Sequence, residues 1–169
     1  TIKKKRKVWN IVQLTVFPLL AKRMDTEFDV FETLLKTLEN NNESLKEGDV
    51  LVISTKYISN SQGRIVNLEK IITSEEGKKV SKEYQLKPEI AEIIIRESDK
   101  IFGGIGGFVI TSSDNIMAPN AGIDKSNAKK GLAILYPTNP YLTAEEIRRK
   151  VFLKFFIHIG VILVDSRLM

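Results

Sequence analysis

A run of apolar residues at positions 50–55 constrains the fold of this chain more than any other feature of its sequence. Val50-Leu51-Val52-Ile53-Ser54-Thr55 follows Glu47-Gly48-Asp49 and is almost uninterrupted by polar side chains. Such a run is typical of a strand that is buried on both faces in a mixed or parallel sheet. We therefore expect a central strand at this position.

Further strands and helices alternate along the chain. Residues 8–17 predict a strand that ends in a Pro18-Leu19-Leu20 turn, and shorter strands are expected at 65–68, 108–111, 132–135 and 160–164. Apolar periodicity and capping residues predict three helices: one from a cap at Asp25 or Thr26 to Asn40-Asn41-Asn42, one over 88–100, and one from the Thr143 capping box to about Phe155. A turn is expected at 59–63. This mixture indicates a single domain of the α/β or α+β class.

The chain has 169 residues, no cysteine and one histidine. A chain of this length buries about 70% of the surface that it exposes when unfolded, so it can hold a hydrophobic core without cross-links. The absence of cysteine excludes disulfides, thiolate zinc sites, iron–sulfur clusters and a cysteine nucleophile. Any chemistry must come from oxygen and nitrogen groups.

The formal charge of +5 is concentrated at the N-terminus. Residues 1–24 contain seven basic side chains and no acidic one, so the rest of the chain carries a formal charge of −2. Binding to nucleic acid requires basic side chains that cluster on the folded surface. We therefore interpret residues 1–7 as a solvated basic tail and expect no nucleic-acid partner. A nuclear localisation signal, or nucleic-acid binding through this tail, is the alternative.

No segment of the sequence is typical of a signal peptide or a membrane span. The apolar stretch at 8–20 is broken by Asn10, Gln13 and Pro18. The longest apolar run, at 151–164, contains Lys154 and His158 and is shorter than the ~20 residues that a spanning helix needs. We expect a cytoplasmic protein without a membrane partner.

Four glycines occur in the five residues Gly103-Gly104-Ile105-Gly106-Gly107. A phosphate-binding P-loop needs its glycines after a strand and before a helix, with Lys-Ser/Thr at its end. The order here is helix, glycines, strand, and the lysine is missing. The segment is therefore interpreted as a flexible lid or hinge, or as an ordinary turn.

Two carboxylates, Asp124 and Asp165, each follow an apolar strand, at the edge where sheets commonly present ligands. Together with neighbouring Ser126, Asn127 and Ser166 they offer oxygen donors, which Mg²⁺ and Mn²⁺ prefer. The alternative is that Asp124 forms an Asx turn and Asp165 caps the segment after it.

Several segments are similar, in order and approximate spacing, to motifs of the coenzyme F420-0:L-glutamate ligase family. The most specific is the octad at 120–127, Asn-Ala-Gly-Ile-Asp-Lys-Ser-Asn. The supporting segments are Gly48-Asp49 with the strand at 50–56, Gln62-Gly63-Arg64, Arg96-Glu97-Ser98 and Val164-Asp165-Ser166. The resemblance implies an α+β fold with a mixed β-sheet and flanking helices, assembled as a homodimer.

The same resemblance implies a function and a site. Members of this family are GTP-dependent ligases that join L-glutamate to the deazaflavin precursor coenzyme F420-0, which makes these two molecules the expected substrates. Mg²⁺ or Mn²⁺ is the expected metal, with Asp124, Asp165 and Ser166 as its ligands. The expected nucleotide contacts are Pro18, Leu19, Leu20, Thr55, Lys56 and Asn127. No catalytic residue is assigned.

The chain also departs from the family pattern. Where the family usually has Ser-Lys-x-Glu-Gly-Arg, positions 59–64 read Ser-Asn-Ser-Gln-Gly-Arg. Residues 8–169 are expected to form a single αβ domain that lacks the family's C-terminal segment. A non-catalytic paralogue that binds a nucleotide or metabolite is therefore the alternative function.

Overall fold

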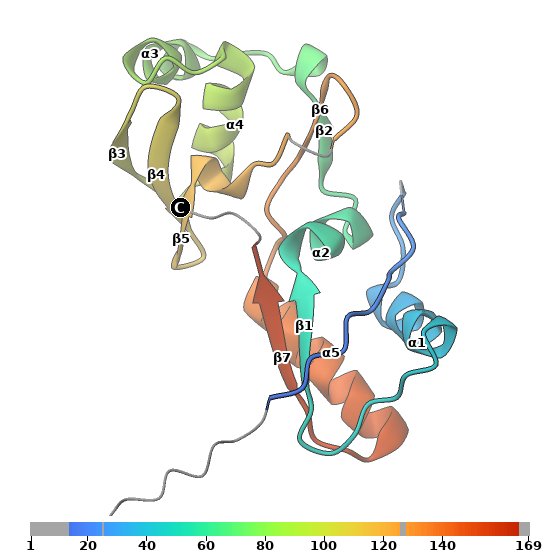
Figure 1. The fold of residues 1–169 in the computed structure, drawn as a ribbon. Helices are drawn as coiled ribbons and strands as arrows, with labels where there is room; N and C mark the ends of the chain where they lie inside the picture. The colour runs from blue at the N-terminus through green and yellow to red at the C-terminus, as the bar shows by residue number, and fades with distance from the viewer. Residues whose placement is uncertain (1–13, 25, 126–127, 166–169) are drawn as a thin grey trace, which may run out of the picture.

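The computed structural model describes residues 14–24, 26–125 and 128–165, in which helices and strands are mixed along the chain (Figure 1). The helices are α1 (Val30–Asn40), α2 (Thr55–Ser61), α3 (Glu75–Glu83), α4 (Pro88–Glu97) and α5 (Pro140–Phe155), with 3-10 turns η1 (Leu68–Lys70) and η2 (Asn120–Gly122). The strands are β1 (Val50–Ser54), β2 (Ile65–Asn67), β3 (Lys100–Ile105), β4 (Phe108–Ser113), β5 (Ile116–Pro119), β6 (Leu132–Ile134) and β7 (Gly160–Val164). The α+β class is confirmed.

The described strands form three small sheets. β1 and β7 pair in parallel, with Val50 opposite Gly160 and Ser54 opposite Val164. β2 and β6 form an antiparallel pair, and β3, β4 and β5 form an antiparallel meander. None of the helices in the described ranges is both long enough and apolar enough to span a bilayer.

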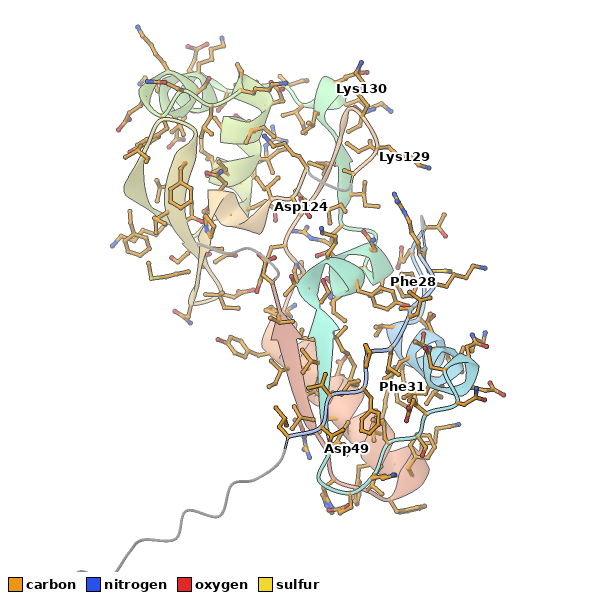
Figure 2. The ribbon with its side chains drawn as sticks, viewed as in Figure 1. Phe28, Phe31, Asp49, Asp124, Lys129 and Lys130 are labelled. Atoms are coloured by element: carbon orange, nitrogen blue, oxygen red, sulfur yellow. The ribbon has the colours of Figure 1, made fainter. Side chains whose placement is uncertain are left out.

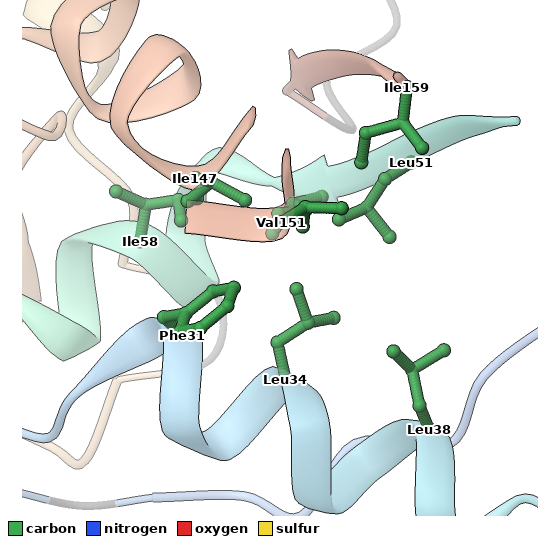
Figure 3. Close-up of a cluster of buried hydrophobic side chains, with 9 residues drawn as sticks. Phe31, Leu34, Leu38, Leu51, Ile58, Ile147, Val151 and Ile159 are labelled. Carbon is green, nitrogen blue, oxygen red and sulfur yellow. The ribbon is translucent and has the colours of Figure 1, made fainter. Parts of the chain in front are cut away.

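One hydrophobic core joins the parallel pair to α1 and α5. Phe31, Leu34 and Leu38 lie three and four residues apart on α1, and the sequence thus places them on one helix face. Figure 3 shows these side chains facing Val151 of α5 and Leu51 of β1. α1 and α5 therefore cover a single face of the parallel pair.

A second core lies around α4. Ile90, Ile93 and Ile94 pack against Ile123, next to η2, and against Ala133 of β6. Pro88 occupies the first turn of α4, where its missing N–H costs no hydrogen bond. Asp124 directly follows Ile123 of this second core and pairs with Ile134 of β6.

Two strand predictions differ from the structure, one in the existence of the strand over its described residues and one in its burial. In the expected strand at 8–17, residues 8–13 lie outside the described ranges, and Leu14, Val16 and Phe17 are exposed and form no strand. The strand at 50–55 exists, but alternate residues are exposed, Val50 and Val52 each to 57%. Among the described residues β1 has one partner strand and helices on one side, so its second face is not buried by them.

The boundaries of three helices also differ from prediction, and the helix expected over 88–100 ends at Glu97 because β3 begins at Lys100. α1 begins at Val30, after Asp29, whose Oδ1 accepts a hydrogen bond from the Glu32 amide at 2.9 Å. Thr26 therefore does not cap α1, and Asp25 lies outside the described residues. α5 begins one turn before Thr143 because Pro140 occupies its first turn.

The polar segment at 59–63 is largely helical, since α2 continues to Ser61 and the chain turns only at Gln62 and Gly63. The glycines at 103–107 belong to the β3–β4 hairpin, which agrees with an ordinary turn. Helix α3 was not predicted. Ser74 caps it by accepting a hydrogen bond from the Gly77 amide at 3.0 Å.

Candidate functional site

The site begins where β1 passes directly into α2. β1 ends at Ser54, and α2 begins at Thr55, so Thr55 and Lys56 occupy the first turn of the helix. Thr55 is buried, while the Lys56 side chain keeps 23% of its surface exposed. The direct passage from strand to helix therefore holds a hydroxyl and an ammonium group at the end of β1.

Asp124 is held at the edge of β6. Its amide donates to the Ile134 carbonyl and its carbonyl accepts from the Ile134 amide, both at 2.8 Å. Its carboxylate forms an ion pair with the Lys56 ammonium, and the Asp124 side chain is 15% exposed. Figure 2 shows Asp124 between α4 and α2. Residues far apart in the sequence thus form one half-buried charge pair.

The turn before Asp124 explains why the octad carries asparagine and glycine. The Asn120 Oδ1 accepts from the Val109 amide at 2.9 Å, and the Ala121 amide donates to the Thr111 hydroxyl at 3.1 Å. Asn120, Ala121 and Gly122 all have positive φ, at 49°, 53° and 67°. These contacts attach the turn to β4 and so fix the position of Asp124.

A small pocket brings together four of the residues that the sequence singled out. Thr55, Lys56, Asp124 and Asp165 all line it. Tyr136 lines it too, and its pKa is raised, first by burial of the phenol and then by the negative charge of Asp165. Tyr136 and Asp165 are thus brought together at one pocket.

A larger pocket of about 670 Å³ lies on the other side of Lys56. Lys56 and Ile134 line both pockets, so the two pockets lie next to each other. Asn60 also lines the larger pocket, and its Oδ1 is buried without a hydrogen-bond partner among the described residues. Asn60 stands where the motif of the resembled family has a lysine.

Gln62, which replaces the family's usual glutamate, has a structural role. Its Nε2 donates to the Thr138 carbonyl at 3.1 Å, and its Oε1 accepts from the Thr138 amide at 2.9 Å. Next to it, Arg64 pairs with Glu97 and donates from Nε to the Tyr136 carbonyl at 3.1 Å. The Gln62-Gly63-Arg64 and Arg96-Glu97-Ser98 motifs thus meet beside Tyr136.

The donor set of the small pocket fits a hard divalent cation. No group of three or more His, Cys, Asp or Glu side chains in the described ranges forms a complete metal site. Mg²⁺, however, is commonly held by one or two carboxylates together with substrate phosphates. Asp124 and Asp165, with the Thr55 hydroxyl beside them, supply such a partial set.

Three of the remaining predicted contacts are not at these pockets. Pro18, Leu19 and Leu20 line neither of them. The Leu20 amide donates to the Asn41 Oδ1 at 3.2 Å, and Leu19 packs on the first core. Asn127 and Ser166 lie outside the described residues. The roles assigned to these five residues stay predictions.

Sequence reasoning missed Tyr136. It follows β6 by two residues, but the sequence argument selected only carboxylates that follow apolar strands. Arg23 and Lys129 line the larger pocket and were also missed. No sequence pattern distinguishes them, because each lies among other charged residues.

Comparison with known proteins decides the family. The model of the F420-0:Gamma-glutamyl ligase family matches residues 19–169. The chain belongs to this family. The match covers both pockets and every described residue that lines them.

Individual relatives support the same family assignment. The chain is 32% identical over 149 residues to the coenzyme F420:L-glutamate ligase of Methanopyrus kandleri, which covers 88% of this chain and 57% of the relative. It is 33% identical over 123 residues to the coenzyme F420:L-glutamate ligase of Methanocaldococcus jannaschii. That match covers 72% of this chain and 49% of the relative. For the coenzyme F420:L-glutamate ligase of Archaeoglobus fulgidus the identity is 28% over 155 residues. That match covers 92% of this chain and 61% of the relative. The chain thus spans about half the length of the curated relatives that it matches.

Proposed function

We propose that this chain takes part in the GTP-dependent ligation of L-glutamate to coenzyme F420-0, with Mg²⁺ or Mn²⁺ at Asp124 and Asp165. The observation that supports it is the convergence of Thr55, Lys56, Asp124 and Asp165 on one pocket. The family of the chain supplies the reaction type, and the relatives' names supply the substrates.

The proposed reaction has two steps. A carboxylate oxygen of the coenzyme precursor attacks the γ-phosphorus of GTP, which gives an acyl phosphate and GDP. The amine of glutamate then attacks the acyl carbon, phosphate leaves with the bonding electron pair, and the nitrogen loses a proton to give the amide. Both steps bring anionic groups together, so positive charge near the phosphates lowers the barrier.

The residues of the small pocket have distinct roles in this scheme. Asp124 and Asp165 would hold the divalent cation, which offsets the charge on the phosphates. The Lys56 ammonium pairs with Asp124 in this structure, and it would bind a phosphate oxygen as a point charge where the cation takes over that carboxylate. Arg64 and Gln62 support the wall that carries Tyr136.

Asp124→Asn tests this proposal, with Asp114→Asn as the matched control. Asp114 is exposed in the β4–β5 turn, away from both pockets. A ligand at a hundred times its Kd stabilises the native state by about 2.7 kcal/mol, which for a chain of this size raises Tm by about 5–10 °C. We expect GTP with Mn²⁺ to raise the Tm of the unmodified chain and of Asp114→Asn, but not that of Asp124→Asn.

A full shift in Asp124→Asn would contradict the site assignment. Incorporation of labelled glutamate into F420-0 then separates the ligase from the non-catalytic alternative, because a binding paralogue gives the Tm shift without incorporation. The third interpretation, nucleic-acid binding through residues 1–7, predicts a steep salt dependence that disappears when the tail is deleted.

A further inference from the structure

Helix α2 presents one face to each of the two pockets. Thr55 and Ser59 are four residues apart and line the small pocket, whereas Lys56 and Asn60, also four residues apart, line the larger one. Residues at this spacing lie next to each other on the surface of a helix. Lys56 and Asn60 are therefore neighbours on one face of α2, and the Lys56 ammonium extends from this face to Asp124 in the small pocket.

The Asn60 side chain has a hydrogen-bond acceptor that this arrangement leaves unused. Its Oδ1 is buried and accepts no hydrogen bond from the described residues. A buried acceptor without a donor is unfavourable, because it has given up its hydrogen bonds to water. The Ser59 and Ser61 hydroxyls of the same helix avoid this cost, since each donates to a backbone carbonyl of α2. The Asn60 Oδ1 is thus an available acceptor beside the Lys56 side chain.

The ion pair between Lys56 and Asp124 involves the carboxylate that the proposed metal needs. A divalent cation bound at Asp124 would lie close to the Lys56 ammonium, and like charges at such short range repel each other. The ammonium must therefore leave Asp124 when the cation binds. Lysine carries three donors on a flexible four-carbon chain, so it can move between two partners without a change in the backbone. An acceptor within reach lowers the cost of this displacement.

We propose that Lys56 exchanges partners within the site: it pairs with Asp124 as in this structure, and it donates to the Asn60 Oδ1 when Mg²⁺ or Mn²⁺ binds that carboxylate. Asn60 is then a positioning residue, which does not touch the metal but favours metal binding by accepting the displaced ammonium. This inference rests on the proposed function, from which it takes the metal at Asp124 and Asp165.

Titration of the chain with Mn²⁺ alone, followed by the electron paramagnetic resonance of the free ion, tests this exchange. Asn60→Ala removes the acceptor, so it should weaken Mn²⁺ binding by about tenfold, as expected for the loss of a hydrogen bond to a charged group. In a Lys56→Met background there is no ammonium to displace, and Asn60→Ala should then change the affinity by less than about twofold. This dependence on Lys56 separates a positioning role of Asn60 from direct ligation of the ion.

Lys56→Met alone should strengthen Mn²⁺ binding by about tenfold, because the ion no longer displaces a charged hydrogen bond. Lys129→Met is its matched control, since it removes the same charge from a lysine that lines the larger pocket but not the small one (Figure 2). The control should leave the Mn²⁺ affinity within about twofold of that of the unmodified chain. The Tm of each variant without ligand checks that the fold is intact.

The unmodified chain offers a second measurement. A hydrogen bond accepted at Oδ1 polarises the whole side-chain amide. The nitrogen NMR resonance of the Asn60 side chain should therefore shift when Mg²⁺ is added to the unmodified chain, and this shift should be absent in Lys56→Met.

Three outcomes would overturn the inference. Weaker Mn²⁺ binding by Asn60→Ala in both backgrounds would make Asn60 a metal ligand. Equal strengthening by Lys56→Met and Lys129→Met would indicate a general charge effect. Unchanged Mn²⁺ binding by Asn60→Ala, or an Asn60 resonance that does not move with Mg²⁺, would remove Asn60 from the exchange. If neither the unmodified chain nor Lys56→Met binds Mn²⁺, the metal assignment of the proposed function itself fails, and that result is distinct from all three.

Discussion

Replacing Gly122 by alanine tests the turn that places Asp124. Gly122 has a φ of +67°, a left-handed conformation that L-residues with a Cβ avoid. A Cβ added at this position would lie 2.6 Å from Cδ2 and 3.0 Å from Cγ of Tyr136, well inside van der Waals contact. The substitution therefore strains the backbone and pushes against the aromatic ring that lines the small pocket.

The two effects have separate magnitudes. The left-handed conformation costs a residue with a Cβ about 1–2 kcal/mol, and overpacking in a filled site costs about 1–3 kcal/mol. Gly122→Ala should therefore lower the free energy of unfolding by about 2–5 kcal/mol. Gly48→Ala is the control, because its φ is +83° but no described atom lies within 4 Å of the added Cβ. It should cost about 1–2 kcal/mol.

Urea denaturation of the two variants measures the difference. We expect Gly122→Ala to be less stable than Gly48→Ala by at least about 1 kcal/mol. In a double-mutant cycle, Tyr136→Ala should recover most of this difference, because it removes the atoms that the Cβ meets. Equal destabilisation by the two glycine substitutions, or no coupling between positions 122 and 136, would refute a steric role for the Tyr136 contact.

Two further predictions concern stability. The Ser74 hydroxyl, followed by the Ser74 amide and Arg96, lowers the pKa of Glu92 from its usual 4.5, so this carboxylate stabilises the fold above that pH. This contribution to the unfolding free energy is lost as the pH falls through the lowered native pKa. Glu92→Gln should therefore destabilise the chain at about pH 7 but much less at about pH 3. Urea unfolding at both pH values measures the difference. Gln62→Glu removes the amide donor to the Thr138 carbonyl, so it should lower the unfolding free energy by about 1 kcal/mol. An unchanged midpoint of urea unfolding would contradict the structural role assigned to Gln62.

The strands were easier to predict from the sequence than the segments that connect them. Short apolar runs identified β1, β2, β4, β6 and β7, because such runs need burial in a sheet, whereas β3 and β5 were not predicted. The polar segment after β1 was misjudged as a turn. In the structure the Ser59 hydroxyl donates to the Thr55 carbonyl at 3.0 Å and the Ser61 hydroxyl to the Ile58 carbonyl at 2.7 Å. These bonds satisfy polar groups inside the helix, and no pattern of residue types reveals them.

The candidate site was accessible to sequence reasoning only in part. Asp124 and Asp165 could be selected one by one, because each follows an apolar strand. The pairing of Asp124 with Lys56 could not be predicted from residue patterns, since it depends on how η2 is attached to β4 through Asn120 and Thr111. The larger pocket is further still from any local pattern, because its lining comes from the segment before α1, from α2 and from the β2–β6 pair.

The parallel pair shows why an apolar run does not define its own surroundings. Val50 and Val52 are exposed on β1, and Ile162 and Val164 are exposed on β7. Val52 lies directly opposite Ile162 in the parallel register, so these side chains form one continuous apolar surface. α1 and α5 cover the other face through Leu51 and Ile53. Valine and isoleucine favour a strand whether or not its second face is covered, because their branched side chains fit the pleated backbone. The run at 50–55 therefore identified the strand correctly, but the number of its covered faces depends on which other elements pack against it.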